Sequence, residues 1–175
     1  MNIWHDLDPS MVTPENFTAV IEIPKGSNTK YELDKKTGLL RLDRILYTAT
    51  HYPENYGFIP LTYGDDLDPL DVLVICSETI HPLTLVQCYP IGVINMIDNN
   101  SHDEKIIAIP FSDPTYHHIE SIHDLPKHIF NQMEHFFTVY KQLEGKETDV
   151  ETVKGRDFAL KIIEEAIARY RHHFK

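Results

Sequence analysis

Residues 52–74 read YPENYGFIPLTYGDDLDPLDVLV, an extended segment, a turn rich in acids and then an apolar run. Asp66, Asp68 and Asp71 follow the spacing i, i+2 and i+5, with a fourth aspartate beside them. Carboxylates this close together repel one another unless a cation neutralises them. The apolar run 72–76 predicts a buried strand, which would hold the acids in fixed positions. The stretch therefore indicates either a metal site anchored on a core strand or an acidic turn that is solvated.

The spacing of these acids excludes an EF-hand calcium loop. A loop that began at Asp66 would place Asp71 where glycine is needed and Ser77 where the bidentate glutamate belongs. The cluster is therefore an oxygen-ligand set of another kind, and its interpretation depends on the rest of the chain.

Length and composition predict one globular domain with a sizeable core. A chain of 175 residues, 42% of them hydrophobic and 25% charged, is ordinary for this class. The formal net charge of −11 disfavours nucleic acid as a partner, because phosphate backbones are bound by clustered Lys and Arg. No apolar run approaches the ~20 residues that a membrane span requires. Cys76 and Cys88 could form one disulfide, but two reduced core thiols in a cytoplasmic protein are the favoured interpretation.

The strand predicted over residues 39–46 places a charge among leucines. Its alternation puts Leu40, Leu42 and Leu46 on one face, and Arg44 points the same way. An arginine on an inward face needs partners, because burying an unpaired charge is costly. Either Arg44 lies in a polar cleft or the strand ends there and the side chain emerges into water, and the pattern leaves both open.

Two further predicted strands repeat this anomaly. In 93–98, Asp98 shares a face with Ile94 and Met96. In 105–109, Lys105 shares a face with Ile107 and Ile109. A hairpin-type connection joins the two strands, with Asp103 just before the return. Charges that recur on apolar faces near strand ends predict a polar cleft at the mouth of a small closed or nearly closed sheet.

The last third of the chain changes to helical periodicity. Asp124 is a candidate N-cap for one amphipathic helix that stops near Gly145, and a second helix is expected over roughly 155–171. The residues predicted to face inward are Ile129, Met133, Phe136, Phe137, Tyr140 and Leu143, then Phe158, Ile162, Ile163, Ala166 and Tyr170. Many short strands followed by two helices predict an α+β fold, a small closed or nearly closed, OB-like β-barrel with two helices packed outside it.

Five separated motifs make the chain similar to one enzyme family. They are IEIPKGSNTKYELD (21–34), LDRILYTATHYPENYGFIP (42–60), DLDPLDV (66–72), GVINMIDNNSHDEKIIAIP (92–110) and HFFTVYKQLEG (135–145). In this order they resemble the soluble inorganic pyrophosphatases of family I, in their compact bacterial form. The resemblance covers nearly the whole chain and implies one pyrophosphatase domain over residues 1–175. One departure is Leu67, which stands where the family usually has a small or polar residue.

The resemblance also implies a role for each charge noted above. The implied metal ligands are Asp66, Asp71 and Asp103, with Asp98 completing a neighbouring site and Glu22 helping to hold a further ion. The implied water-activating carboxylate is Asp68. The implied phosphate contacts are Lys30, Arg44, Tyr56, Lys105, Tyr140 and Lys141, with Glu32 and Tyr52 also in the cavity. An all-oxygen ligand set favours Mg²⁺ over Zn²⁺ as the cofactor.

Two other classes of function stand beside hydrolysis of pyrophosphate. An OB-like module could bind oligonucleotides, although the acidic balance and inward-facing acids oppose this. A calcium-binding structural protein would have metal affinity without turnover. The resemblance further implies a homohexamer, whereas the acidic balance and the lack of a long apolar run predict no nucleic-acid or membrane partner.

Overall fold

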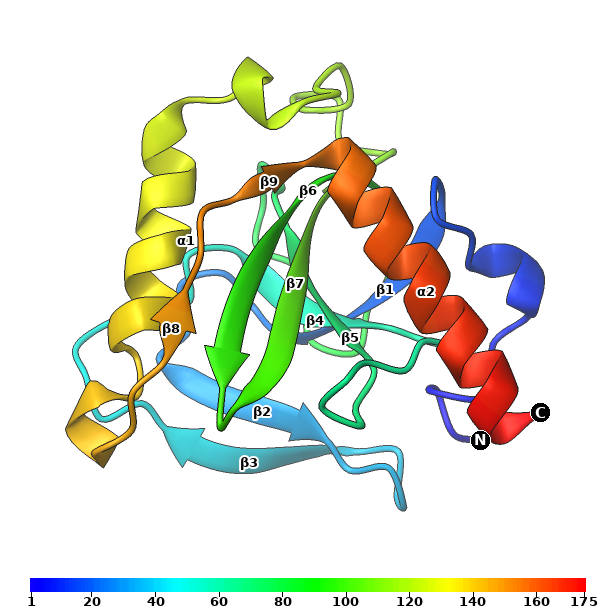
Figure 1. Ribbon diagram of the computed structural model, residues 1–175, viewed down its shortest axis with the longest axis horizontal. Coiled ribbons are helices and arrows are strands. Elements are labelled where there is room, and N and C mark those ends of the chain that lie inside the picture. Colours follow the sequence, from blue (N-terminus) through cyan, green and yellow to red (C-terminus); the bar gives the residue numbers. More distant parts are fainter.

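The computed structural model describes residues 1–175 as strands flanked by two helices (Figure 1). The strands are β1 (Phe17–Ile23), β2 (Thr29–Leu33), β3 (Leu40–Ile45), β4 (Asn55–Ile59), β5 (Leu70–Val74), β6 (Leu85–Asp98), β7 (Ser101–Pro110), β8 (Asp149–Val150) and β9 (Lys154–Gly155). The helices are α1 (Lys127–Val139) and α2 (Arg156–Phe174), with the short 3₁₀ turns η1 (Pro9–Met11), η2 (Ile122–Asp124) and η3 (Gln142–Glu144).

Five of the strands close a ring. β1 pairs with β4, β4 with β5, β5 with β7 and β7 with β6, and β6 returns to pair with β1. Only the β5–β7 pairing is parallel within this ring. β2 and β3 form a separate two-stranded sheet. The predicted α+β class, with a small, nearly closed OB-like sheet and two helices outside it, is confirmed.

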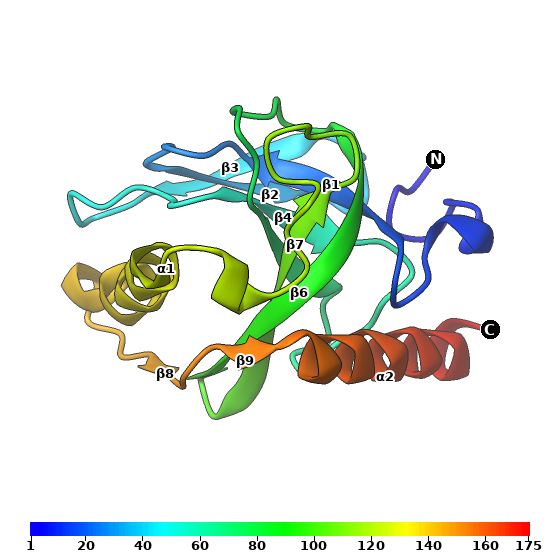
Figure 2. The ribbon, with the colours of Figure 1, turned by 90° about the horizontal axis from the view of Figure 1, so that it is seen from above.

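The two helices lie on either side of the β6–β7 hairpin (Figures 1 and 2). Each helix is attached to the sheet by its own apolar cluster. The buried helix residues are Phe130, Met133, Phe136 and Phe137 in α1 and Ala159, Ile163, Ala166, Ile167 and Tyr170 in α2. Each fully buried large side chain stabilises the fold by ~1.5–3 kcal/mol. The packing of α1 therefore fixes the position of the two residues that follow it, Tyr140 and Lys141. Neither helix combines the length and the apolar character needed to cross a membrane.

The interpretation of the strand around Arg44 is wrong in one respect. Lys30 pairs with Arg44, but Tyr31 pairs with Leu42, so β3 has an extra residue at this point, a β-bulge. The bulge interrupts the alternation on which the prediction depended. Leu42 consequently points outward and is 58% exposed, and no leucine face surrounds Arg44.

The predicted helix limits also need correction. Asp124 belongs to the capping box of η2, and α1 begins only at Lys127. Because α1 ends at Val139, Leu143 leaves the helical face and is 69% exposed. Gly145 does adopt the left-handed conformation expected of a helix stop, at the end of η3.

Two further side chains are less buried than predicted. Phe158, in the first turn of α2, is 53% exposed instead of inward. Both cysteines are free, as expected. Cys88 lies in the core, but Cys76 follows the end of β5 and is only half-buried.

Candidate active site

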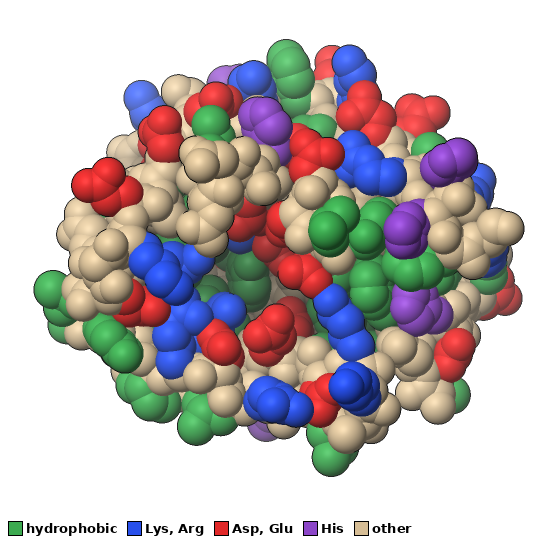
Figure 3. All heavy atoms as spheres, turned by 60° about the horizontal axis from the view of Figure 1, so that its bottom comes forward, with side chains coloured by type: hydrophobic (Ala, Val, Ile, Leu, Met, Phe, Trp, Pro, Cys, Tyr) green, Lys and Arg blue, Asp and Glu red, His purple; other side chains and the backbone are tan.

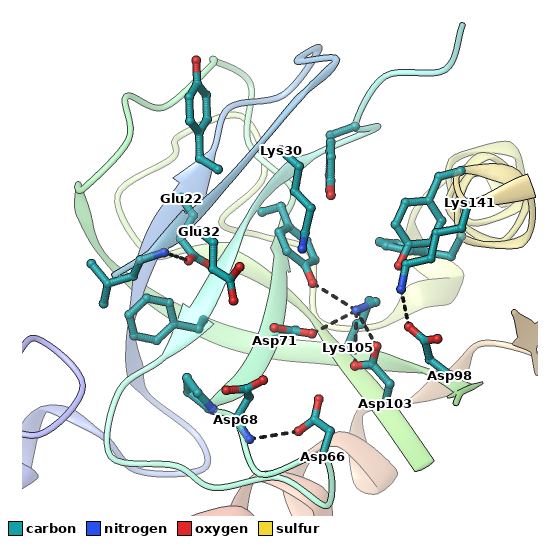
Figure 4. Close-up of a pocket in the computed structure, with 18 of the residues that line it drawn as sticks. Glu22, Lys30, Glu32, Asp66, Asp68, Asp71, Asp98, Asp103, Lys105 and Lys141 are labelled. Carbon is teal, nitrogen blue, oxygen red and sulfur yellow. Dashed lines mark hydrogen bonds and ion pairs between the residues drawn. The ribbon is translucent and has the colours of Figure 1, made fainter. Parts of the chain in front are cut away.

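Acidic and basic side chains face one another across a hollow in the surface (Figure 3). The cavity has a volume of about 220 Å³. Eleven of the twelve predicted site residues line it, namely Glu22, Lys30, Tyr56, Asp66, Asp68, Asp71, Asp98, Asp103, Lys105, Tyr140 and Lys141. Glu32 and Tyr52 line it too, and Figure 4 shows how the labelled charges surround the central Lys105.

Backbone hydrogen bonds hold the acidic loop between β4 and β5. The Gly64 amide donates to the Asp68 carbonyl at 2.8 Å, and the Leu67 amide donates to the Gly64 carbonyl at 3.2 Å. The Asp68 amide donates to Oδ1 of Asp66 at 3.3 Å. A Cβ atom on Gly64 would lie 2.9 Å from the same Oδ1, so any side chain there would press on the Asp66 carboxylate. The loop therefore fixes the backbone around the acids, as the sequence predicted.

The β6–β7 hairpin supplies the opposite wall. Asn99 and Asn100 have φ values of 52° and 63°, which a tight type I′ turn requires. Beyond the turn, Asp103 pairs across the ladder with Met96. Since Asp98 lies two residues from Met96, the carboxylates of Asp98 and Asp103 share one face of the hairpin.

Lys105 occupies the centre of the cavity and is only 2% exposed. Its Nζ donates to Asp71 Oδ2 at 2.9 Å, to the Tyr56 hydroxyl at 3.0 Å and to Asp103 at 3.3 Å. It also lies 4.9 Å from the centre of the Phe137 ring. Burial disfavours the charged ammonium, but the two carboxylates outweigh this and hold the pKa of Lys105 well above its ordinary value.

Three carboxyl groups of the cavity have raised pKa values. Burial raises the pKa of Glu22 to about 8, although its carboxylate accepts a 2.7 Å hydrogen bond from the Leu33 amide. Burial raises the pKa of Asp71 to about 7, against the opposing effect of Lys105. For Asp66, burial and the nearby Asp103 raise the pKa to about 6. Holding these ionised carboxylates close together in the folded protein costs free energy, and a bound cation would reduce that cost.

Lysine side chains pair with the remaining acids at the rim. Lys141 donates to Asp98, and Lys30 donates to Asp43 at 3.0 Å. Lys35 donates to Asp68 Oδ1 and lines the cavity. The Lys35 side chain is 40% exposed in the turn between β2 and β3, and no local pattern around it predicts its contact with Asp68.

Arg44 lies beside the cavity and not in its lining. Its Nε lies 2.9 Å from Oε1 of Glu144, and Nη1 lies 2.5 Å from Oδ2 of Asp43. The Arg44 side chain is 20% exposed and that of Glu144 only 9%. Of the two interpretations left open by the sequence, neither holds fully, because Arg44 is partly buried but is paired with acids outside the cavity lining.

The family model described as "Inorganic pyrophosphatase" matches residues 19–171. The chain belongs to the inorganic pyrophosphatase family. It is 47% identical over 171 residues to the inorganic pyrophosphatase of Aquifex pyrophilus, an alignment that covers 96% of this chain and 97% of the relative. It is 44% identical to soluble inorganic pyrophosphatase 2 of Chlamydomonas reinhardtii, over 98% of this chain and 89% of that one.

Solved pyrophosphatase structures have the same fold. The inorganic pyrophosphatase of Helicobacter pylori superposes with a TM-score of 0.90 at 42% identity, covering 95% of this chain and 99% of that chain. That of Thermus thermophilus gives a TM-score of 0.92 at 37% identity, covering 98% and 99%. The resemblance recognised from the five motifs is therefore confirmed.

The donor set of this pyrophosphatase fits a hard divalent cation. No group of three His, Cys, Asp or Glu side chains is arranged to hold a metal ion in this structure, and the ammonium groups of Lys105 and Lys141 lie among the carboxylates. Asp98 Oδ1 is nevertheless buried without a hydrogen-bond partner. An orphaned carboxylate oxygen beside acids with raised pKa values is the environment that Mg²⁺, an oxygen-preferring ion, stabilises.

Proposed function

We propose that this protein hydrolyses inorganic pyrophosphate to two phosphates with Mg²⁺ as its cofactor. The observation that carries the proposal is one cavity that combines clustered carboxylates with clustered cationic side chains. Pyrophosphate is a compact and highly charged anion, so its site needs both metal ligands and direct cationic contacts. A site for a larger or neutral ligand would not need this density of charge in about 220 Å³.

The proposed metal ligands come from two walls of the cavity. Asp66 and Asp71 lie on the β4–β5 side, and Asp103 faces them from β7, with Asp98 in a neighbouring site and Glu22 contributing to a further ion. When bound, Mg²⁺ would neutralise charge and would lower the pKa of a water, so that the water could lose its proton near neutral pH. Asp71 would be a central ligand of this set, because its place opposite Lys105 in the β5–β7 ladder puts it at the middle of the cluster.

Asp68 is the proposed acceptor of the proton of the attacking water. Its Oδ1 accepts a hydrogen bond from Lys35, which leaves Oδ2 as the oxygen that can take a proton. The water then attacks one phosphorus in line with the leaving phosphate.

The cationic and phenolic side chains stabilise the charge on the phosphate oxygens. Lys30, Lys105 and Lys141 carry positive charge into the cavity, and Tyr56 and Tyr140 add neutral donors. Arg44 is the proposed sixth contact, at the rim, where its planar fork suits a bidentate grip on phosphate. To make that contact, it must exchange at least one of its partners in this structure, Asp43 or Glu144.

Release of phosphate from pyrophosphate is the test. The purified protein should release two phosphates per pyrophosphate with Mg²⁺, should lose this activity with excess chelator and should regain it when Mg²⁺ is restored. No release with Mg²⁺, or release that persists after chelation, would refute the proposal. Metal affinity without turnover would favour the calcium-binding alternative. Salt-dependent binding of an oligonucleotide would favour the OB-like module.

The proposal extends to the state of the whole protein. We infer one domain over residues 1–175, a homohexameric assembly and a cytoplasmic location. The alignment with the Aquifex pyrophilus relative, which covers 96% of this chain and 97% of the relative, supports the single domain. The resemblance to the compact bacterial form supports the homohexamer and the cytoplasmic location. Light scattering on a sizing column measures the assembly directly.

A further inference from the structure

Trp4 and Lys35 reach the active cavity from segments that no sequence pattern connects with it. Both line the cavity. The Lys35 ammonium lies 4.6 Å from the centre of the Trp4 ring, and the same ammonium donates to Oδ1 of Asp68. One lysine thus joins a buried aromatic ring to the carboxylate to which we assign proton transfer.

The Trp4 ring is held firmly in its position. It is 6% exposed, and its indole N–H donates to the Thr62 carbonyl at 2.9 Å. The Leu61 amide donates to the Trp4 carbonyl at 3.0 Å. Asn2 donates from its side chain to the Lys35 carbonyl at 3.1 Å. The segment 1–5 therefore connects the turn that carries Lys35 to the start of the acidic loop.

We propose that Lys35 is a positioning residue for Asp68, and that the Trp4 ring holds the Lys35 ammonium where it can act; this rests on the proposed function of Asp68. Lysine has a long flexible stem, so without a second contact its ammonium would sample many positions in water. A ring face provides that contact through a cation–π interaction. With Oδ1 held by Lys35, the carboxylate of Asp68 keeps one orientation, and Oδ2 is left for the water.

The neighbouring lysine provides a matched control. Lys36 lies in the same turn and carries the same charge, but its side chain makes no hydrogen bond or ion pair; only its backbone amide is engaged, with Asp34. Lys35→Met and Lys36→Met therefore remove the same charge from the same turn. Only the first removes a contact with Asp68.

The kinetic experiment compares the two variants with the wild type on pyrophosphate and Mg²⁺. Correct placement of a general base contributes ~10²–10⁴-fold, and losing part of its orientation should reduce kcat about five- to tenfold in Lys35→Met. KM should stay within about twofold, because Asp68 does not hold the substrate. Lys35→Arg should recover most of kcat, and Lys36→Met should match the wild type.

Trp4 is the sole tryptophan of the chain, so its fluorescence reports on the contact without any turnover. Removing the ammonium from the ring should change the emission of Trp4 in Lys35→Met and leave it unchanged in Lys36→Met. Identical emission spectra in the two variants would overturn the contact with Trp4.

The possible failures are distinguishable. Wild-type protein that releases no phosphate would overturn the proposed function, and the role of Lys35 with it. An active wild type with equal kcat in the two methionine variants would overturn the role of Lys35 alone. A raised KM at unchanged kcat would mean that Lys35 binds substrate instead of positioning Asp68. A lower melting temperature at unchanged kcat would make it a structural residue only.

Discussion

Replacing Leu67 with glycine should stabilise this protein. Leu67 has a φ of 67°, in the left-handed region, and its side chain is 65% exposed. The left-handed conformation costs an L-residue ~1–2 kcal/mol, and glycine adopts it freely. Glycine loses more chain entropy on folding, at a cost of ~0.5–1 kcal/mol. Little burial is lost with an exposed side chain, so the net gain should lie between about 0 and 1.5 kcal/mol, with a central value of about 0.75 kcal/mol.

A gain of this size is measurable by thermal unfolding. For a chain of 150–250 residues, 1 kcal/mol shifts the melting temperature by about 2–4 °C, so Leu67→Gly should melt about 1–4 °C higher. The Mg²⁺ concentration that gives half-maximal activity should stay within about twofold of the wild type. The reason is that the hydrogen bonds of Gly64, Leu67 and Asp68 already hold the loop in this conformation.

Two further variants separate backbone strain from side-chain effects. Leu67→Ala removes most of the same side chain but keeps Cβ, so its stability should stay within about 0.5 kcal/mol of the wild type. Leu83→Gly changes another exposed leucine with a φ of 65°, outside the acidic loop, and should raise stability in the same way. If Leu67→Ala stabilises as much as Leu67→Gly, the gain comes from losing an exposed apolar group, and the strain argument is refuted.

Three other predictions concern the acids. Asp68→Asn should keep Mg²⁺ binding but lose ~10²–10⁴-fold in kcat. Asp65 is a half-exposed neighbour, and Asp65→Asn should have only a mild effect on kcat. Equal losses of kcat in the two variants would contradict the assigned roles. Gly64→Ala should raise the Mg²⁺ requirement, because the new Cβ would lie 2.9 Å from Asp66 Oδ1, and an unchanged titration would disprove this. Burial raises the pKa of the Glu54 carboxyl group to about 7. The contribution of this group to the stability of the fold is therefore complete below its pKa in the unfolded chain, and it is lost as the pH rises through about 7. Glu54→Gln should therefore gain in melting temperature relative to the wild type between pH 5 and pH 8, and a constant difference would exclude this titration.

Local sequence patterns predicted the parts of the site that lie on regular strands. Asp98 and Lys105 face the cavity because β6 and β7 are long and regular near their hairpin, so a period of two holds along them. The acidic loop was recognisable because its spacing is local, and Asp66, Asp68 and Asp71 lie within six residues. The placement of such site residues can be predicted from the sequence of the neighbouring residues alone.

The remaining features depend on contacts between distant segments. The bulge in β3 depends on the pairing with β2, and it removes Arg44 from the alternation that the sequence implied. The contact of Lys35 with Asp68 joins residues 33 positions apart. Trp4 lines the cavity only because the segment 1–5 folds back over Thr62. No periodicity of one segment contains information about such contacts.

Lys105 accounts for the way in which so many carboxylates coexist in the folded protein. With 2% of its surface exposed, it lies between Asp71 at 2.9 Å and Asp103 at 3.3 Å, where it neutralises charge that would otherwise oppose folding. The Tyr56 hydroxyl completes its partners at 3.0 Å. If these carboxylates hold Mg²⁺ as we propose, their charge would no longer require the lysine, and the ammonium would become available to the phosphate oxygens. On these proposed roles, metal binding and substrate binding would be linked through the Lys105 side chain, because each would make the other more favourable.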